Sequence, residues 1–336
     1  MTMVPQKNLT IGDIADALGI SKTTVSRAIS GKGRIGEDTR KKVLDYIDAN
    51  NYKPNPMAKG LADQKTYNVC WVIPGDSTMS DLPFFQRCMA GVCEVTMSMN
   101  YDVLISLVYE ENLSHLKRIV ENKKVDGVII GRTLVEDASV KFLKEVGIPF
   151  VVIGSTPEKN VIQIDNDHIT ACRELTSILV MKGIKRIALI GGSTTHVVNN
   201  SRYQGFKEGL ESQGVAFNTD LCFLNNDTDE DVERAVDAAL SVGVDCIMCM
   251  DDRICYAALM KLHRDEVVIP ADVKVASFYN SDLLVNNQPA ITALRYDPKE
   301  LGNVACRTLM KVIDGEDVRE KTLLGYEVML KGSTQK

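Results

Sequence analysis

The sequence predicts an α/β protein in three parts: an N-terminal headpiece of three helices, a short hinge, and a two-lobed body built on parallel sheets. Two observations support this prediction. The headpiece shows only helical apolar spacing, whereas the chain from Tyr67 onward alternates short, continuously apolar strands with amphipathic helices. Such strands are typical of parallel sheets that helices cover on both faces. The expected boundaries are 1–54 for the headpiece, 55–66 for the hinge and linker, and 67–336 for the body.

A helix-turn-helix is expected within the headpiece. Apolar residues recur at helical spacing in its first helix, namely Ile11, Ile14, Ala15 and Leu18. Gly19 ends that pattern, and Ser21 suits the N-cap of a second helix. The apolar side of the second helix consists of Val25, Ala28 and Ile29. Its opposite side carries small polar and basic residues, namely Lys22, Thr23, Ser26 and Arg27. Such a helix suits the major groove of DNA, although a packed helical hairpin would show the same apolar pattern.

A third helix is expected after a basic loop at 31–34. Glu37 and Asp38 stand at its start, where the helix dipole favours anions. Its apolar residues are expected to complete the core of the headpiece, namely Val43, Leu44 and Ile47. In the loop, Lys32 and Arg34 are candidates for phosphate contacts, with simple solvation as the alternative.

The charge distribution also favours DNA binding by the headpiece. Residues 1–60 hold ten Lys or Arg and six Asp or Glu, a net charge of +4. The whole chain has a net charge of −6, so residues 61–336 carry −10. A basic module on an acidic body is typical of a specific DNA-binding protein.

The hinge is expected to hold a short, marginal helix. Asn55 suits its N-cap and Pro56 its first turn. Gly60 weakens an isolated helix by about 1 kcal/mol relative to Ala, and a helix this short is marginal in water. It should therefore order only when another surface holds it. The alternative is an ordinary interdomain linker.

The segment LTIGDIADALGISKTTVSRAIS resembles the DNA-binding headpiece of the LacI/GalR family of bacterial transcription regulators. The matching residues are Thr10, Asp13, Ile14, Ala15, Gly19, Ser21, Thr24, Val25, Ser26 and Arg27. Leu18 and Ser30 depart from the usual Ala and Asn. The resemblance implies contacts with DNA by Thr10, Ile11, Ser21, Lys22, Thr23, Ser26, Arg27, Lys32, Arg34, Asn55, Ala58, Lys59 and Leu61. It places Leu61 as a wedge in the minor groove, where apolar side chains unstack and kink DNA.

The resemblance extends over nearly the whole chain and implies a function. It implies a transcription regulator that represses carbohydrate-utilisation genes. Its body would be similar to periplasmic sugar-binding proteins. A small effector (a sugar, glycoside or sugar phosphate) would bind between the lobes and control operator affinity. Because one helix-turn-helix contacts few bases, we expect a homodimer on a pseudo-palindromic operator.

The body is expected to contain two series of strands and helices. Strands are expected at 67–73, 102–107, 126–131, 149–153, 186–191, 244–250 and 273–277, and helices at 84–99, 112–122, 166–182, 229–242 and 252–264. The first series ends at Gly154 and the second begins near Ile164. Segment 276–302 resembles the crossover back to the first lobe, and 322–334 resembles the family's closing strand. Ligands of parallel sheets bind beyond the carboxyl ends of the strands, so we expect a cleft between the lobes.

Candidate effector residues in the first lobe follow its strands. Phe84 and Phe85 come after the first strand, and aromatic faces stack on sugar rings. The alternative for these two residues is a place in the core. Arg132 and Thr133 follow strand 126–131.

Further candidates lie in the second lobe. Arg202 matches the family's R-x-x-G-F motif, whose Arg binds effector hydroxyls or carboxylates, with a structural salt bridge as the alternative. His196 lies in a polar loop and is either a ligand contact or solvated. Asp251 matches the family position that accepts from sugar hydroxyls, whereas Asp252 is expected to cap the next helix. Tyr279 replaces a ligand-contacting Asp of the family, which favours a glycoside or disaccharide.

The nine cysteines are scattered and odd in number. Cys246 and Cys249 form a C-x-x-C on an expected strand, but residues three apart on a strand point to opposite faces. Buried core cysteines are therefore expected rather than a metal or redox site, which no second Cys or His pair supports.

Two other functional classes fit the sequence poorly. A secreted sugar-binding protein would need a signal peptide, but the segment MTMVPQKNLT lacks an apolar core, and no stretch approaches the roughly 20 apolar residues of a membrane span. An α/β enzyme would need a catalytic or phosphate-binding motif, but no G-x-G-x-x-G follows the first strand and neither a P-loop nor G-x-S-x-G is present. We expect a cytoplasmic regulator that is not an enzyme, with no cofactor, metal or membrane partner.

Overall fold

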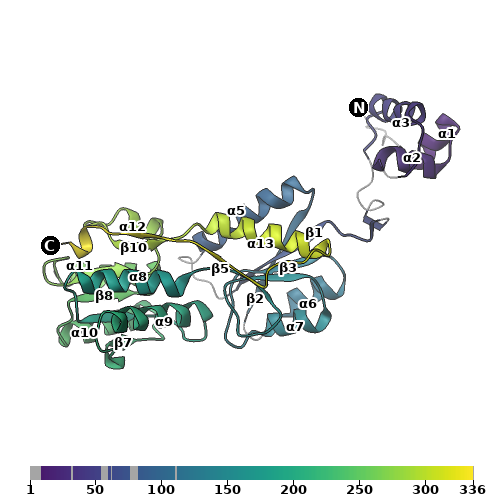
Figure 1. Cartoon of the computed structure of the whole chain (residues 1–336). Coiled ribbons are helices and arrows are strands. Elements are labelled where there is room, and N and C mark those ends of the chain that lie inside the picture. The colour runs from purple at the N-terminus through teal and green to yellow at the C-terminus, as the bar shows by residue number, and fades with distance from the viewer. Residues whose placement is uncertain are drawn as a thin grey trace, which may run out of the picture. The chain divides into compact units, whose positions relative to one another are not determined.

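The computed structural model describes residues 9–31, 33–53, 60–61, 63–75, 82–109 and 112–335. Its internal contacts divide the chain into two compact units, Met1–Thr66 and Tyr67–Lys336 (Figure 1). No helix among the described residues is long and apolar enough to cross a membrane.

The first unit contains three helices, α1 (Ile11–Leu18), α2 (Lys22–Ser30) and α3 (Glu37–Ala49). Thr10 and Asp13 form a capping box at the start of α1, and Gly19 ends that helix with a φ of 62°. Ser21 caps α2 by accepting a hydrogen bond from the Thr24 backbone N–H. The expected helix-turn-helix and its turn are therefore present.

The expected core of the headpiece is correct except at Leu44. Val43 is fully buried, but Leu44 is exposed and Ile47 is only partly buried. Tyr46 and Tyr52 pack in this core instead. The reason is helical geometry: positions 43, 46 and 47 share one face, and Leu44 is turned about 100° away from Val43.

The second unit contains two six-stranded sheets. The first is parallel throughout, in the order β11-β5-β4-β3-β1-β2. Its strands are β1 (Asn68–Pro74), β2 (Asp102–Val108), β3 (Gly127–Ile130), β4 (Phe150–Ile153), β5 (Ile162–Asn166) and β11 (Lys321–Leu324). The second sheet has the order β12-β10-β9-β8-β6-β7, in which only β12 is antiparallel. Its strands are β6 (Ile187–Ile190), β7 (Cys222–Phe223), β8 (Cys246–Cys249), β9 (Lys274–Ser277), β10 (Thr292–Arg295) and β12 (Glu327–Met329).

Helices cover both faces of each sheet. In the first lobe, α5 (Leu82–Ser98) and α13 (Pro298–Ile313) pack on one face, and α6 (Ser114–Glu121) and α7 (Ala138–Val146) on the other. In the second lobe, α8 (His168–Met181) and α9 (Val197–Ser212) face α10 (Asp229–Ser241) and α11 (Asp252–Arg264) across the sheet. Short elements complete this lobe, namely α12 (Asp282–Val285), η1 (Thr219–Leu221) and η2 (Gly332–Thr334).

Most of the predicted elements are confirmed. All the expected strands and helices of the body occur, with ends displaced by at most two residues. Segment 276–302 does lead from the second lobe into α13 on the first. The two cysteines of the C-x-x-C lie on opposite faces of the second sheet, Cys246 toward α8 and Cys249 toward α10 and α11.

Two expectations about the lobes are wrong. The second lobe does not begin near Ile164, because β5 pairs with β4 in the first sheet and only α8 starts the second lobe. The closing segment 322–334 is not one strand but two short ones, β11 in the first sheet and β12 in the second. Both errors arise because the chain changes lobe directly at the end of a strand, and apolar periodicity does not reveal which sheet a strand joins.

Candidate functional site

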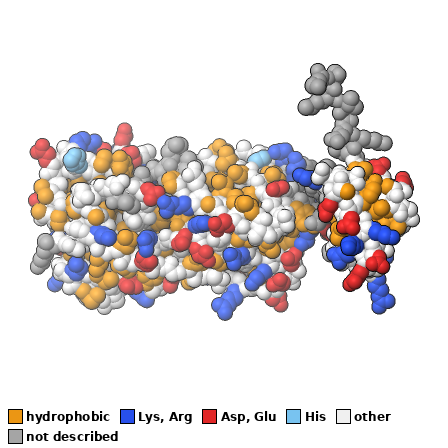
Figure 2. All heavy atoms as spheres, turned by 90° about the horizontal axis from the view of Figure 1, so that it is seen from above, with side chains coloured by type: hydrophobic (Ala, Val, Ile, Leu, Met, Phe, Trp, Pro, Cys, Tyr) orange, Lys and Arg blue, Asp and Glu red, His pale blue; other side chains and the backbone are white. Residues whose placement is uncertain are grey.

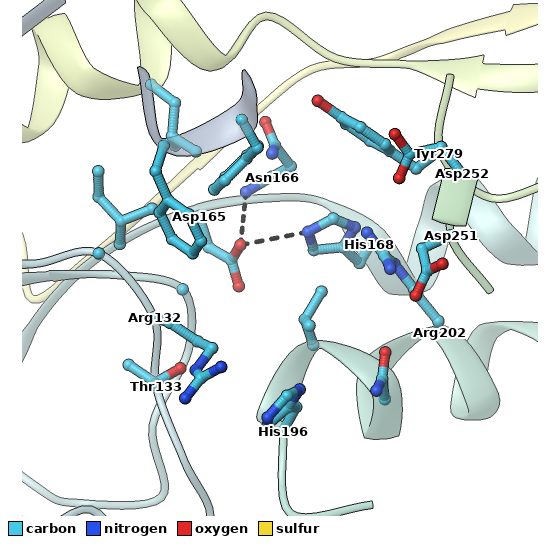
Figure 3. Close-up of a pocket in the computed structure, with 18 of the residues that line it drawn as sticks. Arg132, Thr133, Asp165, Asn166, His168, His196, Arg202, Asp251, Asp252 and Tyr279 are labelled. Atoms are coloured by element: carbon cyan, nitrogen blue, oxygen red, sulfur yellow. Dashed lines mark hydrogen bonds and ion pairs between the residues drawn. The ribbon is translucent and has the colours of Figure 1, made fainter. Parts of the chain in front are cut away.

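A pocket of about 180 Å³ lies between the two lobes of the second unit (Figure 3). Its walls come from the carboxyl ends of strands in both sheets and from the starts of α5, α9 and α11. The polar residues that line it are Arg132, Thr133, Asp165, Asn166, His168, His196, Asn199, Arg202, Asp251, Asp252, Tyr279 and Ser281. The pocket therefore occupies the place that the parallel-sheet rule predicts.

The structure brings together every residue that the sequence proposed for effector binding. These are Phe84, Phe85, Arg132, His196, Arg202, Asp251 and Tyr279. Four separate elements or loops of the second lobe and two of the first supply them, so they converge only in the folded unit. Their role in binding remains a prediction.

Arg202 is held at the pocket by the packing of α9. Gly205, three residues later, packs so closely on α8 that an added Cβ would lie 2.4 Å from the Ile169 carbonyl oxygen. Phe206 is 1% exposed in the core beside it. The R-x-x-G-F sequence thus seats α9 on α8 and places the Arg202 guanidinium at the pocket wall.

The Arg202 side chain is buried with donors to spare. It is 8% exposed, its Nε has no hydrogen-bond partner, and it makes no ion pair with any residue in the described part of the chain. A structural salt bridge is therefore not its role here. A buried N–H donor without an acceptor costs free energy of folding. A ligand oxygen that accepts a hydrogen bond from Arg202 would remove this cost.

The cap of α11 is Asp251 rather than the expected Asp252, although both aspartates line the pocket. Asp251 is the N-cap of α11, since its Oδ1 accepts from the Ile254 backbone N–H at 2.8 Å. Asp252, expected to be the cap, is instead buried at 8% exposure. Burial raises the pKa of Asp252 to about 6, against the lowering effect of a hydrogen bond with Ser281. Because α11 begins at Asp252, the residue that flanks its first turn and can cap it is Asp251.

Aromatic side chains form one wall across both lobes. Phe84 of α5 meets Tyr279 of the second lobe edge to face, with ring centroids 6.1 Å apart. Tyr279 in turn stacks on Tyr296 at 6.2 Å with an interplanar angle of 13°. Phe85 lines the pocket but is also buried in the first lobe's core. Phe84 is thus the more available of the two phenylalanines for a ring contact.

Sequence reasoning missed a polar group at the crossover between β5 and α8. Asp165 lies 3.5 Å from His168 Nε2 (Figure 3). Asp165 also accepts a hydrogen bond from Ser155 Oγ, and His168 Nδ1 lies 3.3 Å from the Tyr296 hydroxyl. Burial lowers the pKa of His168, although Asp165 opposes this shift. Burial acts to raise the pKa of Asp165, but its bonds with His168 and Ser155 outweigh that and lower it.

Asn166 belongs to the same missed group. It is 4% exposed, and its Oδ1 has no hydrogen-bond partner. Asp165 and Asn166 are the last residues of β5 and His168 follows it, so their place at the carboxyl end of a strand is the signal that identified the other pocket residues. It was missed because no strand was expected at 162–166, where the second lobe was expected to begin.

The headpiece presents the predicted DNA-contacting face of α2 to solvent. Lys22, Thr23, Ser26 and Arg27 are all exposed, whereas Val25 and Ala28 are buried. Arg34, Thr10 and Ser21 are also exposed, and Ile11 is partly buried. Lys32, Asn55, Ala58 and Lys59 lie outside the described residues. Leu61 has helical backbone and a side chain that is 84% exposed.

The body presents no comparable basic face in the view of Figure 2. There, basic and acidic side chains are interspersed over the second unit rather than gathered by sign.

Comparison with known proteins identifies the relatives of this architecture. Residues 10–55 match the family model described as bacterial regulatory proteins, lacI family, and residues 176–334 match a periplasmic binding protein-like domain. Catabolite control protein A of Streptococcus mutans is 28% identical over 333 residues, covering 97% of this chain and 98% of its own. The transcriptional regulator MalR of Streptococcus pneumoniae is 28% identical over 312 residues, covering 91% of this chain and 93% of its own.

Two solved structures match nearly the full length of the chain. A complex of the transcriptional regulator CelR with cellobiose has a TM-score of 0.73 at 26% identity, covering 97% of this chain and 99% of that one. The chain belongs to the lacI family. A lac repressor dimer bound to operator shares the fold, with a TM-score of 0.80 at 20% identity over 98% of this chain and all of that one.

Membership of the lacI family settles the class of protein. Its members are DNA-binding transcription regulators rather than enzymes, and the headpiece and body of this chain both match. The chain is a sequence-specific DNA-binding regulator with a ligand-binding type of body, as the sequence predicted.

Proposed function

We propose that this lacI-family protein is a repressor of carbohydrate-utilisation genes whose operator affinity is controlled by a sugar bound between the two lobes. The observation that carries the proposal is Arg202, a buried guanidinium with an unpartnered Nε facing a pocket. Aromatic rings and carboxyl groups stand in the same pocket. Sugars present hydroxyls that both donate and accept, together with apolar ring faces, so they match this set of groups.

The relatives support a sugar as the effector. CelR, which is 26% identical over nearly the full chain, is described in complex with cellobiose. Phe84 and Tyr279 bring aromatic surface from both lobes to the pocket wall, and an aromatic residue at 279 favours a glycoside or disaccharide.

A thermal-shift screen of the full-length protein tests the sugar proposal. Neutral mono- and disaccharides, cellobiose among them, are compared with their phosphorylated forms. A ligand that binds only the native state raises the melting temperature by mass action. A shift with at least one sugar or sugar phosphate is expected, and no shift across the series would contradict the proposal.

We propose further that two copies of the chain associate through the edge strand β2 of the first lobe. Ile105 and Leu107 share one face of that strand, and Tyr109 follows its last residue; they are 47%, 48% and 46% exposed. Met97, at the end of α5, is 77% exposed. An apolar sheet edge left open promotes association, and two-fold symmetry matches a pseudo-palindromic operator. Sedimentation should give a dimer at micromolar concentration, and Leu107→Asp should give monomers while Val242→Asp, an exposed apolar site elsewhere, should not.

The DNA proposal assigns base contacts to the exposed face of α2 and a minor-groove wedge to Leu61. Selection from random duplexes should enrich a pseudo-palindrome. Leu61→Ala should then reduce affinity and bending of that duplex while leaving ligand-induced thermal shifts unchanged, because a wedge acts only on DNA. An unaltered bend in a permuted-site gel assay would contradict the wedge.

A further inference from the structure

The two lobes contact one another directly on both sides of the pocket, away from the chain crossovers. On one side, the segment after β3 pairs with the loop before α9. The Val135 backbone N–H donates to the Thr195 carbonyl at 2.9 Å, and the Val197 N–H donates to the Thr133 carbonyl at 3.4 Å. Leu134 and His196 stand opposite each other as an isolated antiparallel bridge. Figure 3 shows Thr133 and His196 together on this side of the pocket.

Each half of this bridge is anchored within its own lobe. In the first lobe, the Thr133 hydroxyl donates to the Ser155 carbonyl at 2.6 Å. Asp137 accepts from the Leu134 N–H and also caps α7. The conformation of the first-lobe segment is therefore held by hydrogen bonds within its own lobe.

The second-lobe loop is held equally firmly by side-chain amides. Asn225 accepts from the Thr194 N–H and hydroxyl, Asn199 donates to the Ser193 carbonyl, and Asn200 donates to the Thr194 carbonyl. Because each segment is already ordered by hydrogen bonds within its own lobe, forming the bridge costs little conformational entropy.

An ion pair joins the lobes on the opposite side of the pocket. Arg87 on α5 lies 2.7 Å from Asp282 at the start of α12. The pair stands near the Phe84–Tyr279 contact, which also crosses between the lobes. Both side chains are exposed, so the pair is a weak and salt-sensitive connection.

We propose that the Thr133–Val135/Thr195–Val197 bridge and the Arg87–Asp282 pair form a two-sided clasp that holds the lobes together by contacts of the protein alone. A ligand must then enter through an opening of this clasp, and the angle between the lobes depends on its strength as well as on the ligand. The clasp goes beyond sugar binding, because all of its hydrogen bonds and its ion pair are made between protein groups.

The amides of the bridge report on the clasp directly. Val135 and Val197 have no other hydrogen-bond acceptor for their N–H groups in the described part of the chain. Val197 is the first residue of α9, where an amide has no partner within the helix. Slow hydrogen exchange at these two amides therefore measures the closed population.

The experiment is residue-resolved hydrogen exchange on the full-length, ligand-free protein. In the wild type both amides should be protected. Arg87→Asp and Asp282→Arg should each accelerate their exchange about two- to fivefold, in keeping with an exposed ion pair. The double exchange Arg87→Asp with Asp282→Arg should restore protection, and 1 M NaCl should shrink these differences.

Two further variants separate the clasp from general destabilisation. Arg264→Asp breaks a similar exposed pair with Glu233 at 2.6 Å inside the second lobe, and it should leave both amides unchanged. Val197→Pro removes one bridge donor at a helix position that accepts proline, and the preceding His196 has a compatible ψ of 121°. It should accelerate Val135 exchange about fivefold, as expected for one hydrogen bond.

Unprotected Val135 and Val197 amides in the wild type would overturn the proposal. So would charge reversals that act no differently from Arg264→Asp, or a double exchange that fails to restore protection. None of these results depends on a sugar, so they leave the proposed effector untouched.

Discussion

The headpiece and the pocket place their functional side chains in opposite ways. The headpiece presents Lys22, Thr23, Ser26 and Arg27, which lie within six residues of sequence, as exposed side chains of one helix. The pocket collects its groups from several distant segments and buries them, with Arg202 at 8% exposure and Asp252 also at 8%. Exposed side chains on one helix can contact a large partner such as DNA. Buried polar groups instead suit a small ligand that enters the pocket and forms hydrogen bonds with them. The two sites should therefore respond differently to mutation.

The largest expected effect would separate the two units completely. Val25 is fully buried in the small headpiece core, and Val25→Asp would bury a charge there. Burying this charge should lower the free energy of unfolding of the headpiece by about 4 kcal/mol or more. So small a core does not supply that much stability, so the headpiece should unfold. Calorimetry should show the body's transition unchanged while DNA binding disappears. A body that melts earlier would show that the two units are not independent.

Arg202→Met should abolish the ligand-induced thermal shift without costing stability. Removing a buried, unpartnered guanidinium and keeping its apolar stem is neutral or stabilising in the absence of ligand. The melting temperature of the ligand-free variant should therefore equal or exceed that of the wild type, and operator binding should persist. A strongly destabilised variant would mean that Arg202 is structural.

Asp252→Asn should raise the free energy of unfolding at neutral pH by at most about 2–3 kcal/mol. The reason is that the pKa of Asp252 is about 6 in the folded protein, against 3.8 in the unfolded chain. The folded state binds this proton more tightly, so the wild type loses stability as the pH rises from about 4 to 6. The advantage of the variant should grow across that window and stay constant above it. Melting temperatures of both proteins from pH 4 to 8 measure this. A constant difference at every pH would show that Asp252 does not titrate there.

Arg27→Ala should weaken binding to the selected operator by about 1–3 kcal/mol and barely affect random DNA. Arg34→Ala, in the exposed loop, should weaken both alike and lower the salt slope by about 1. Fluorescence anisotropy titrations at several salt concentrations distinguish the two. Equal losses on both DNAs for Arg27→Ala would remove its base-reading role and weaken the contrast between the two sites.

The sequence by itself determined the features that depend on neighbouring residues. Helix caps at Thr10 and Ser21, the exposed and buried sides of α2, and the strands of the body all follow from spacing of a few residues. The R-x-x-G-F motif identified Arg202 as a pocket residue only through the family resemblance, because Gly205 and Phe206 position α9 by packing on distant residues.

Only the tertiary structure decided which segments meet. It assigned β5 to the first lobe, and with it brought Asp165, Asn166 and His168 into the pocket. It buried Asp252 rather than Asp251, and it paired the loops at 133–135 and 195–197 across the lobes. Periodicity encodes which face of an element is apolar, but it carries no information about the distant element that will cover that face.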